Sequence, residues 1–193
     1  MKKVFLLMVL MATIVQVCQA QERGKFRVGF DFGNVILHNG GGLLTAFEPK
    51  QNLTDNMNIG FRFENVVIIK KIDFGDDNSK KDLSGGMSFI GTFDRYFNKN
   101  NSMFSPFIGG GLGYNIVGNA QFSVEDESGN AELSGKLGGL VRAGFELGKL
   151  RMAATYNLIG KSEIGEGAEA VEVKNSYLGI SLGFYLGGGK WKK

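Results

Sequence analysis

The chain has 193 residues, 30 of them glycine and 16 phenylalanine, and a net charge of +3 from 22 basic and 19 acidic residues. This length fits about one domain, and so much glycine argues against a helical domain, because glycine weakens helices and serves sheets that need close backbone approach. The small net charge gives no reason to expect nucleic-acid binding.

The N-terminus has the composition of a cleavable signal peptide. Lys2 and Lys3 precede an apolar run over residues 4–15, and Cys18-Gln19-Ala20 offers small residues of the kind that a signal peptidase reads. The apolar run is shorter than the roughly 20 residues that a membrane-spanning helix needs. We therefore expect a cleaved signal peptide over residues 1–20.

A lipoprotein leader, acylated at Cys18, is the alternative, but Val17 is larger than the residue that normally precedes such a site. Cleavage after residue 20 leaves a single mature domain over 21–193. Because the leader removes two lysines and no acids, the net charge falls from +3 to +1. The mature domain also has no cysteine, which excludes disulfides and thiolate metal sites.

Strict alternation of apolar and polar residues, the period of a β-strand, runs through the mature domain. Five segments show it clearly: 25–32, 57–64, 141–147, 150–158 and 178–184. Three weaker segments are 43–53, 87–97 and 106–116. Pro49 cannot donate a ladder hydrogen bond and predicts a bulge in the first of these, while Ile90 and Arg95 leave the faces of the second ambiguous. We predict eight strands.

The connections between these strands alternate in length. Residues 54–56, 98–102 and 148–149 form short connections, whereas 67–86, 117–138 and 159–176 form long, polar ones, and 38–42 is intermediate. One end of the sheet is thus trimmed and the other elaborated, as in outer-membrane barrels. The predicted fold is all-β: an eight-stranded antiparallel up-and-down transmembrane β-barrel.

The polar face of the predicted strands combines opposite charges with many glycines. Such a face suits a narrow, enclosed lumen, where ions must pair to offset desolvation, and eight strands leave an interior just wide enough for side chains to fill. We therefore expect a structural charge network inside a filled lumen, with the apolar face toward lipid. Its predicted members are Arg27, Asp31, Arg62, Glu64, Asp94, Arg142, Glu146 and Arg151.

The sequence also resembles the small outer-membrane β-barrel family of diderm bacteria, which includes the OmpA membrane domain and OmpX. The segments that carry the resemblance are 26–33, 52–57, 104–113, 141–149 and 175–186. It implies insertion by the barrel-assembly machinery, with both termini periplasmic. The chain departs from the family pattern in its Gly-Lys-rich tail over residues 187–193, and no soluble domain like that of OmpA follows the barrel.

The remaining polar residues carry no clear chemical motif. His38, the only histidine, could serve a lipid A-modifying enzyme, but no serine and acid are placed for it as a triad requires. The acidic cluster over 73–82 lacks calcium-loop spacing. Four lysines could contact lipid phosphates: Lys70, Lys71, Lys80 and Lys81. We expect no catalytic residue, cofactor or metal site.

The leading hypothesis is a non-enzymatic barrel with a structural or surface-interaction role through its long extracellular loops. The expected partners are outer-membrane lipid and lipopolysaccharide, the barrel-assembly machinery during insertion, and an unidentified surface ligand. Nucleic acid is not expected, and the barrel should be a monomer. Two alternatives stay open: a lipid A-modifying barrel enzyme, and a soluble secreted barrel that binds a ligand in an apolar interior.

Overall fold

A computed structural model gives the fold of the protein. It describes residues 22–37, 40–72, 80–97, 102–120, 131–160, 162–164, 171–173 and 175–189. The predicted signal peptide, His38 and most of the acidic cluster over 73–82 lie outside these residues. Within them, no helix has the length and hydrophobicity needed to cross a membrane.

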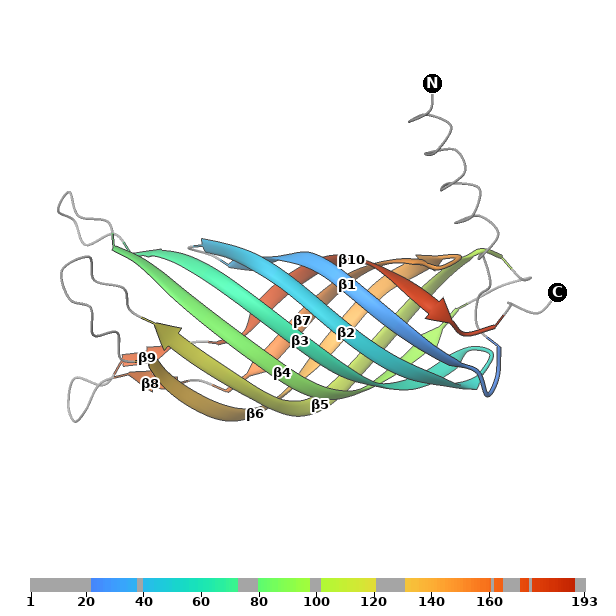
Figure 1. Ribbon diagram of the computed structural model, residues 1–193, viewed down its shortest axis with the longest axis horizontal. Helices are drawn as coiled ribbons and strands as arrows, with labels where there is room; N and C mark the ends of the chain where they lie inside the picture. The colour runs from blue at the N-terminus through green and yellow to red at the C-terminus, as the bar shows by residue number, and fades with distance from the viewer. Residues whose placement is uncertain are drawn as a thin grey trace, which may run out of the picture.

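Ten strands are described, and eight of them form one closed barrel (Figure 1). The barrel strands are β1 (Phe26–Leu37), β2 (Gly40–Thr54), β3 (Met57–Ile72), β4 (Lys80–Tyr96), β5 (Phe104–Ala120), β6 (Ala131–Leu147), β7 (Leu150–Ile159) and β10 (Tyr177–Gly187). Each barrel strand pairs antiparallel with the next barrel strand along the chain, so that β7 pairs with β10. The pairing of β10 with β1 closes the sheet. The predicted eight-stranded up-and-down barrel is confirmed. The other two strands, β8 (Ser162–Ile164) and β9 (Val171–Val173), form a separate small sheet.

The strands are strongly inclined to the barrel axis, as Figure 1 shows. A row of paired residues runs once around the barrel: Gly187, Arg27, Lys50, Gly60, Thr92, Gly111, Leu140, Asn157 and Tyr177. The row leaves β10 at Gly187 and returns to it at Tyr177, so the sheet closes with a stagger of 10 residues. With eight strands about 4.8 Å apart, this stagger implies a tilt of about 40°.

The long connections are shorter than the sequence suggests, and this prediction was wrong in detail. β3 and β4 occupy much of the predicted connection 67–86, and β5 and β6 occupy much of 117–138. In β3, β4 and β5 the ladders continue here without a regular alternation of apolar and polar residues, so the pattern that identifies a strand is lost although the pairing is not. The four lysines expected in the first connection therefore lie in β3 and β4: Lys70, Lys71, Lys80 and Lys81.

The bulge predicted at Pro49 is also wrong. The pairing of β2 with β1 runs through Pro49 without a shift, and the pairing with β3 resumes at Lys50 in the register it had at Phe47. The irregularity lies instead between Asn52 and Thr54, next to the short turn. Pro49 lies at a position where the pairing with β1 continues although proline has no N–H group to donate.

The two ends of the described chain are fastened together across the end of the barrel that carries the short turns. Glu22 N donates to Gly188 O at 2.7 Å, and Gly188 N donates to Phe26 O at 2.9 Å. The buried side chain of Asn52 bridges both ends, because its Nδ2 atom donates to Glu22 O at 3.0 Å and to Gly188 O at 3.1 Å. We refer to these contacts as the terminal clasp.

Replacing Asn52 by alanine should loosen the terminal clasp without altering a strand face that meets the surroundings. One buried and one partly buried carbonyl group would each lose a donor, which should reduce the free energy of unfolding by about 1–3 kcal/mol. The measurement is the temperature at which the folded band converts to the unfolded band on a gel of unboiled, detergent-solubilised protein. Gln51→Ala, at the exposed neighbouring position, is the control. An Asn52→Ala midpoint equal to that of the control would contradict this role.

Candidate functional site

The barrel interior contains the main concentration of chemical groups in the described structure. Ten charged side chains are buried there, each at most 4% exposed. Five are cationic: Arg27, Lys50, Arg62, Arg142 and Arg151. Five are anionic: Asp31, Glu48, Glu64, Asp94 and Glu146. The formal charges of this set cancel, which is what a poorly hydrated interior requires.

Glu48 lies at the centre of this network. Its carboxylate accepts hydrogen bonds from Arg142 Nη2 at 2.7 Å and from Arg142 Nη1 at 3.1 Å. Arg62 Nη1 approaches it at 3.3 Å and Lys50 Nζ at 3.5 Å, while Thr92 Oγ1 donates to it at 2.6 Å. One carboxylate from β2 thus ties together groups from β2, β3, β4 and β6, on both sides of the lumen.

Asp94 and Arg62 extend the network to either side of Glu48. Asp94 accepts from Arg142 Nε at 2.8 Å and pairs with Lys50 Nζ. Arg62 donates from Nε to Glu64 at 2.7 Å and from Nη1 to Asp31. Each of these carboxylates therefore has a cationic partner, and the cations from β2, β3 and β6 lie between them.

Tyrosines complete the network toward both ends of the barrel. Toward the short turns, Glu146 accepts from Arg27 Nη1 at 2.9 Å and from the Tyr96 hydroxyl at 2.7 Å. Toward the long connections, Glu64 accepts from the Tyr177 hydroxyl at 2.6 Å. These neutral donors satisfy carboxylate oxygens without adding charge, so the charge balance is kept.

Aromatic rings also contact the cations directly. The Arg27 guanidinium lies 4.1 Å from the centroid of the Tyr185 ring, and that of Arg151 lies 4.2 Å from the centroid of Phe107. A desolvated guanidinium gains from the face of an aromatic ring. These rings fill the lumen and partly replace the hydration that the cations have lost.

Glycines on the inner face make room for the network. A β-carbon at Gly183 would overlap the Asp31 carboxylate, one at Gly109 would overlap that of Asp94, and one at Gly29 would overlap the ring of Tyr185. These three positions explain part of the high glycine content. At each of these positions, the residue beside a large buried side chain is a glycine, which leaves the space free.

A second, apolar layer fills the lumen on the side of the long connections. Its buried members come from five strands: Val35, Leu44, Ala46, Val66, Ile159 and Tyr177. Leu37, Ile68 and Val117 pack against it and are partly buried. The interior therefore has a charged layer and, closer to the long connections, an apolar layer. This apolar layer could not be predicted from the sequence, because inward and outward apolar residues look alike at strand ends.

The structure places all eight sequence-predicted network residues on the inner face and brings them together. It adds two residues that the sequence analysis missed, Glu48 and Lys50. Both lie on the inward row of β2, where Leu44, Ala46 and Asn52 also lie. This row was readable as an alternation, but Pro49 between them made the strand look irregular.

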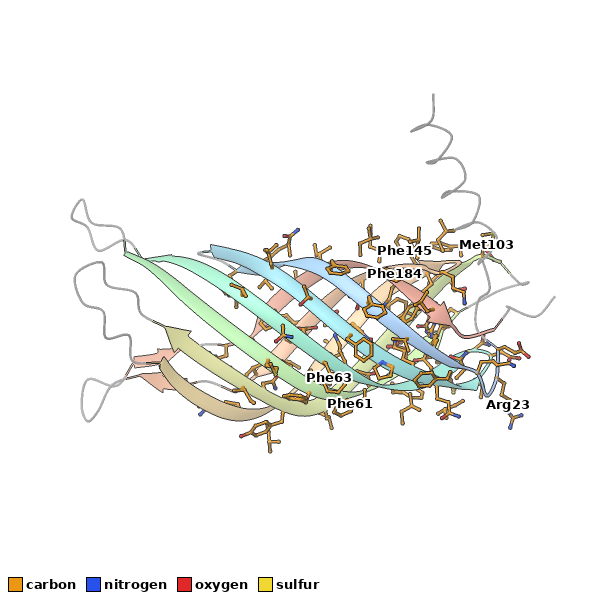
Figure 2. The ribbon with its side chains drawn as sticks, viewed as in Figure 1. Arg23, Phe61, Phe63, Met103, Phe145 and Phe184 are labelled. Atoms are coloured by element: carbon orange, nitrogen blue, oxygen red, sulfur yellow. The ribbon has the colours of Figure 1, made fainter. Side chains whose placement is uncertain are left out.

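The outer face of the barrel is apolar. Every barrel strand exposes large apolar side chains, and Figure 2 shows Phe61, Phe145 and Phe184 on the outside of the sheet. Phenylalanine rings contact one another across neighbouring strands, with centroids 5.4 Å apart for Phe30 and Phe184 and 5.2 Å apart for Phe30 and Phe47. Among barrel positions whose side chains are described, Arg95, close to the short turns, is the one charged residue on this face.

Solved structures with a similar fold are outer-membrane barrels. OprG from Pseudomonas aeruginosa matches with a TM-score of 0.55 and 15% identity, over 87% of this chain and 98% of that chain. The N-terminal barrel domain of OprF from the same organism (TM-score 0.44, 10% identity, 86% and 100% covered) and Ail of Yersinia pestis (0.42, 14%, 85% and 99%) are less similar. No protein-family model and no curated protein matches the sequence. The likeness confirms the small-barrel fold that the sequence resemblance predicts.

Removing the charge of Glu48 should destabilise the barrel strongly. Glu48→Gln leaves four cations with less compensation, because Lys50, Arg62, Arg142 and Arg151 all pair with this carboxylate. An uncompensated buried charge costs about 3–5 kcal/mol. Lys50→Met in the same chain restores the charge balance and keeps most of the side-chain volume. The double variant should therefore be more stable than the sum of the two single effects predicts. Unfolding in urea with the protein in detergent measures all four proteins, and strictly additive losses would contradict the coupled network.

Proposed function

We propose that this protein is a non-enzymatic β-barrel of a bacterial outer membrane, with a structural or surface-interaction role through the end that carries its long connections. The observation that carries the proposal is the inverted distribution of side chains. Charges that balance one another are buried in the lumen, and large apolar side chains cover the outside of every strand. In water such a surface would aggregate, whereas in lipid it is the surface that a spanning barrel needs.

This arrangement argues against a soluble ligand-binding barrel. A soluble barrel would direct its apolar residues inward and its charges outward. Here Arg62, Glu64 and Asp94 are at most 1% exposed inside the barrel, whereas Phe61, Phe63 and Phe93 beside them in the sequence are 36–44% exposed outside. A soluble barrel and a membrane barrel show the same alternation. They differ in whether the apolar face points into the barrel or out of it.

A filled lumen argues against general diffusion through the barrel. The charged layer spans the interior from β2 to β6 through Glu48 and Arg142, and the apolar layer lies above it. Water and ions would have to cross both layers. We therefore place the role of the protein outside the lumen.

The long strands direct attention to one end of the barrel. A tilted strand of 17 residues, such as β5, spans roughly 40 Å along the axis, whereas the apolar band of outer-membrane barrels is about 25 Å tall. β3 to β6 therefore project beyond the membrane on the side of the long connections. By the same reasoning, the terminal clasp lies at the periplasmic end, which is where insertion by the barrel-assembly machinery leaves the termini.

The lipid A-modifying enzyme finds no support in the described residues. His38, on which this alternative rests, lies outside them. The charged residues of the lumen are occupied with one another between the two ends of the barrel.

Fractionation tests the membrane assignment. The protein should sediment with outer membranes, resist extraction by carbonate, and migrate differently on gels before and after boiling, because a closed barrel resists detergent at ambient temperature. An established periplasmic protein of the same host is the control. A soluble periplasmic pool without a heat-dependent shift would overturn the proposal.

Planar-bilayer recording tests the filled lumen. The refolded wild-type barrel should give no stable, stepwise conductance at moderate voltages, because the paired charges and the apolar layer leave no continuous water path. A general porin, reconstituted in the same way, is the positive control. Regular ohmic steps from the wild-type barrel would contradict the filled lumen while leaving the membrane assignment intact.

A further inference from the structure

The strand β6 is longer than one of its neighbours. On one side, all of β6 from Ala131 to Leu147 pairs with β5, whereas on the other side β7 pairs only with the part from Gly138 onward. Residues 131–137 therefore have a strand on one side and, within the part of the chain that the structure describes, no paired strand on the other. An open edge of this kind presents N–H and C=O groups to which another strand can add.

This edge lacks two of the features that protect natural edge strands, proline and a bulge. Proteins usually blunt an exposed edge with proline, charged residues such as lysine, or bulges. The pairing of residues 131–137 with β5 runs without a register shift, and this stretch contains no proline. Its outward residues Gly135 and Leu137 are uncharged, and Leu137 is 80% exposed, whereas the charged residues Glu132 and Lys136 alternate with them. The edge is therefore well formed and ready to accept a strand.

The strand β8 follows β7 closely enough to reach this edge. β7 ends at Ile159, which pairs with Gly138, and β8 begins at Ser162. If the register of β7 on β6 continued, β8 would lie opposite residues 133–135. β8 also pairs with β9 much as β7 pairs with β10, with Ser162 opposite Val173 beyond Asn157 opposite Tyr177. The small sheet of β8 and β9 thus continues the β7–β10 pair, with its register shifted by one residue.

Side chains interrupt the ladder where this tip leaves the barrel. Ser176 Oγ accepts a hydrogen bond from Ile159 N at 3.2 Å and donates one to Ile159 O at 3.2 Å. Asn175 Nδ2 donates to Gly160 O at 2.8 Å. These side chains bind the backbone groups that a continuing strand pair would use. The tip can therefore leave the barrel wall without leaving buried backbone groups unpaired.

We propose that the open edge of β6 is a strand-addition site and that its occupant is β8 of the same chain. In this arrangement, Ser162–Ile164 pair with residues 133–135 and extend the wall of the barrel upward beside the apolar layer that contains Ile159. Only two residues separate β7 from β8, so the local concentration of β8 at the edge far exceeds that of a second molecule. This proposal concerns the barrel wall and does not depend on the proposed surface role.

Engineered disulfides test the pairing directly, because the only cysteine of the chain lies in the predicted signal peptide. Ser134→Cys combined with Glu163→Cys joins two positions that the extended register places opposite each other, within reach of a disulfide. Oxidation of isolated membranes, followed by a non-reducing gel of the boiled protein, should show an intramolecular cross-link. Glu163→Cys with Glu172→Cys, which are paired in β8 and β9, is the positive reference.

The matched control places the second cysteine on the other strand of the tip. Ser134→Cys with Glu172→Cys should cross-link several-fold less, because β9 would lie one strand farther from β6. Efficient cross-linking of the first pair and weak cross-linking of this control support the proposal. Equal, weak cross-linking of both pairs beside an efficient positive reference would overturn it. Disulfide-linked dimers of the single variant Ser134→Cys would also overturn it, because a second molecule would then occupy the edge.

Discussion

The pairing of buried charges inside a narrow barrel is the constraint on which the rest of the structure depends. Eight strands enclose too little space for a hydrated interior, so every ion there must find its counter-ion among the other side chains of the lumen. Glu48 meets this requirement by joining Arg142, Arg62 and Lys50. The charge balance, the phenolic donors and the inward glycines at Gly109 and Gly183 all follow from it, because each removes either an unpaired charge or a steric conflict near a pair.

The network also determines which face meets the surroundings. Six of the eight barrel strands, β1 to β4, β6 and β7, carry charges on the inward row. Their outward rows then carry the apolar residues, because the two rows alternate. The apolar layer around Leu44 and Val66 then closes the lumen toward the long connections without further ions. A lumen occupied in this way leaves the strand ends and connections as the parts that can meet a partner. The proposed surface role is therefore a consequence of how the interior is filled.

The sequence predicted the features that alternation encodes and missed those that it does not. The clear strands and eight of the ten buried charges were accessible because polar and apolar residues change places at every step. Glu48 and Lys50 were missed because Pro49 suggested an irregular strand. Ile90 and Arg95 obscured their strand because each occupies the face that its polarity disfavours: Ile90 is fully buried inside, and Arg95 lies outside near the short turns. The outer parts of β3, β4 and β5 were missed because pairing there continues without a regular alternation of apolar and polar residues.

The point at which the β6–β7 pairing ends also limits how far lipid can extend along the barrel. In hydrocarbon every backbone N–H and C=O group must be satisfied within the protein, so an open strand edge cannot face lipid. Between β6 and β7 the closed ladder ends at Gly138 and Ile159, and among the residues that the structure describes no strand pairs with this side of β6 beyond that point. If the barrel spans a membrane, the hydrocarbon must therefore end at or below this level on that side. The open edge then lies in the headgroup region or beyond it, where water can satisfy the edge until a strand adds to it.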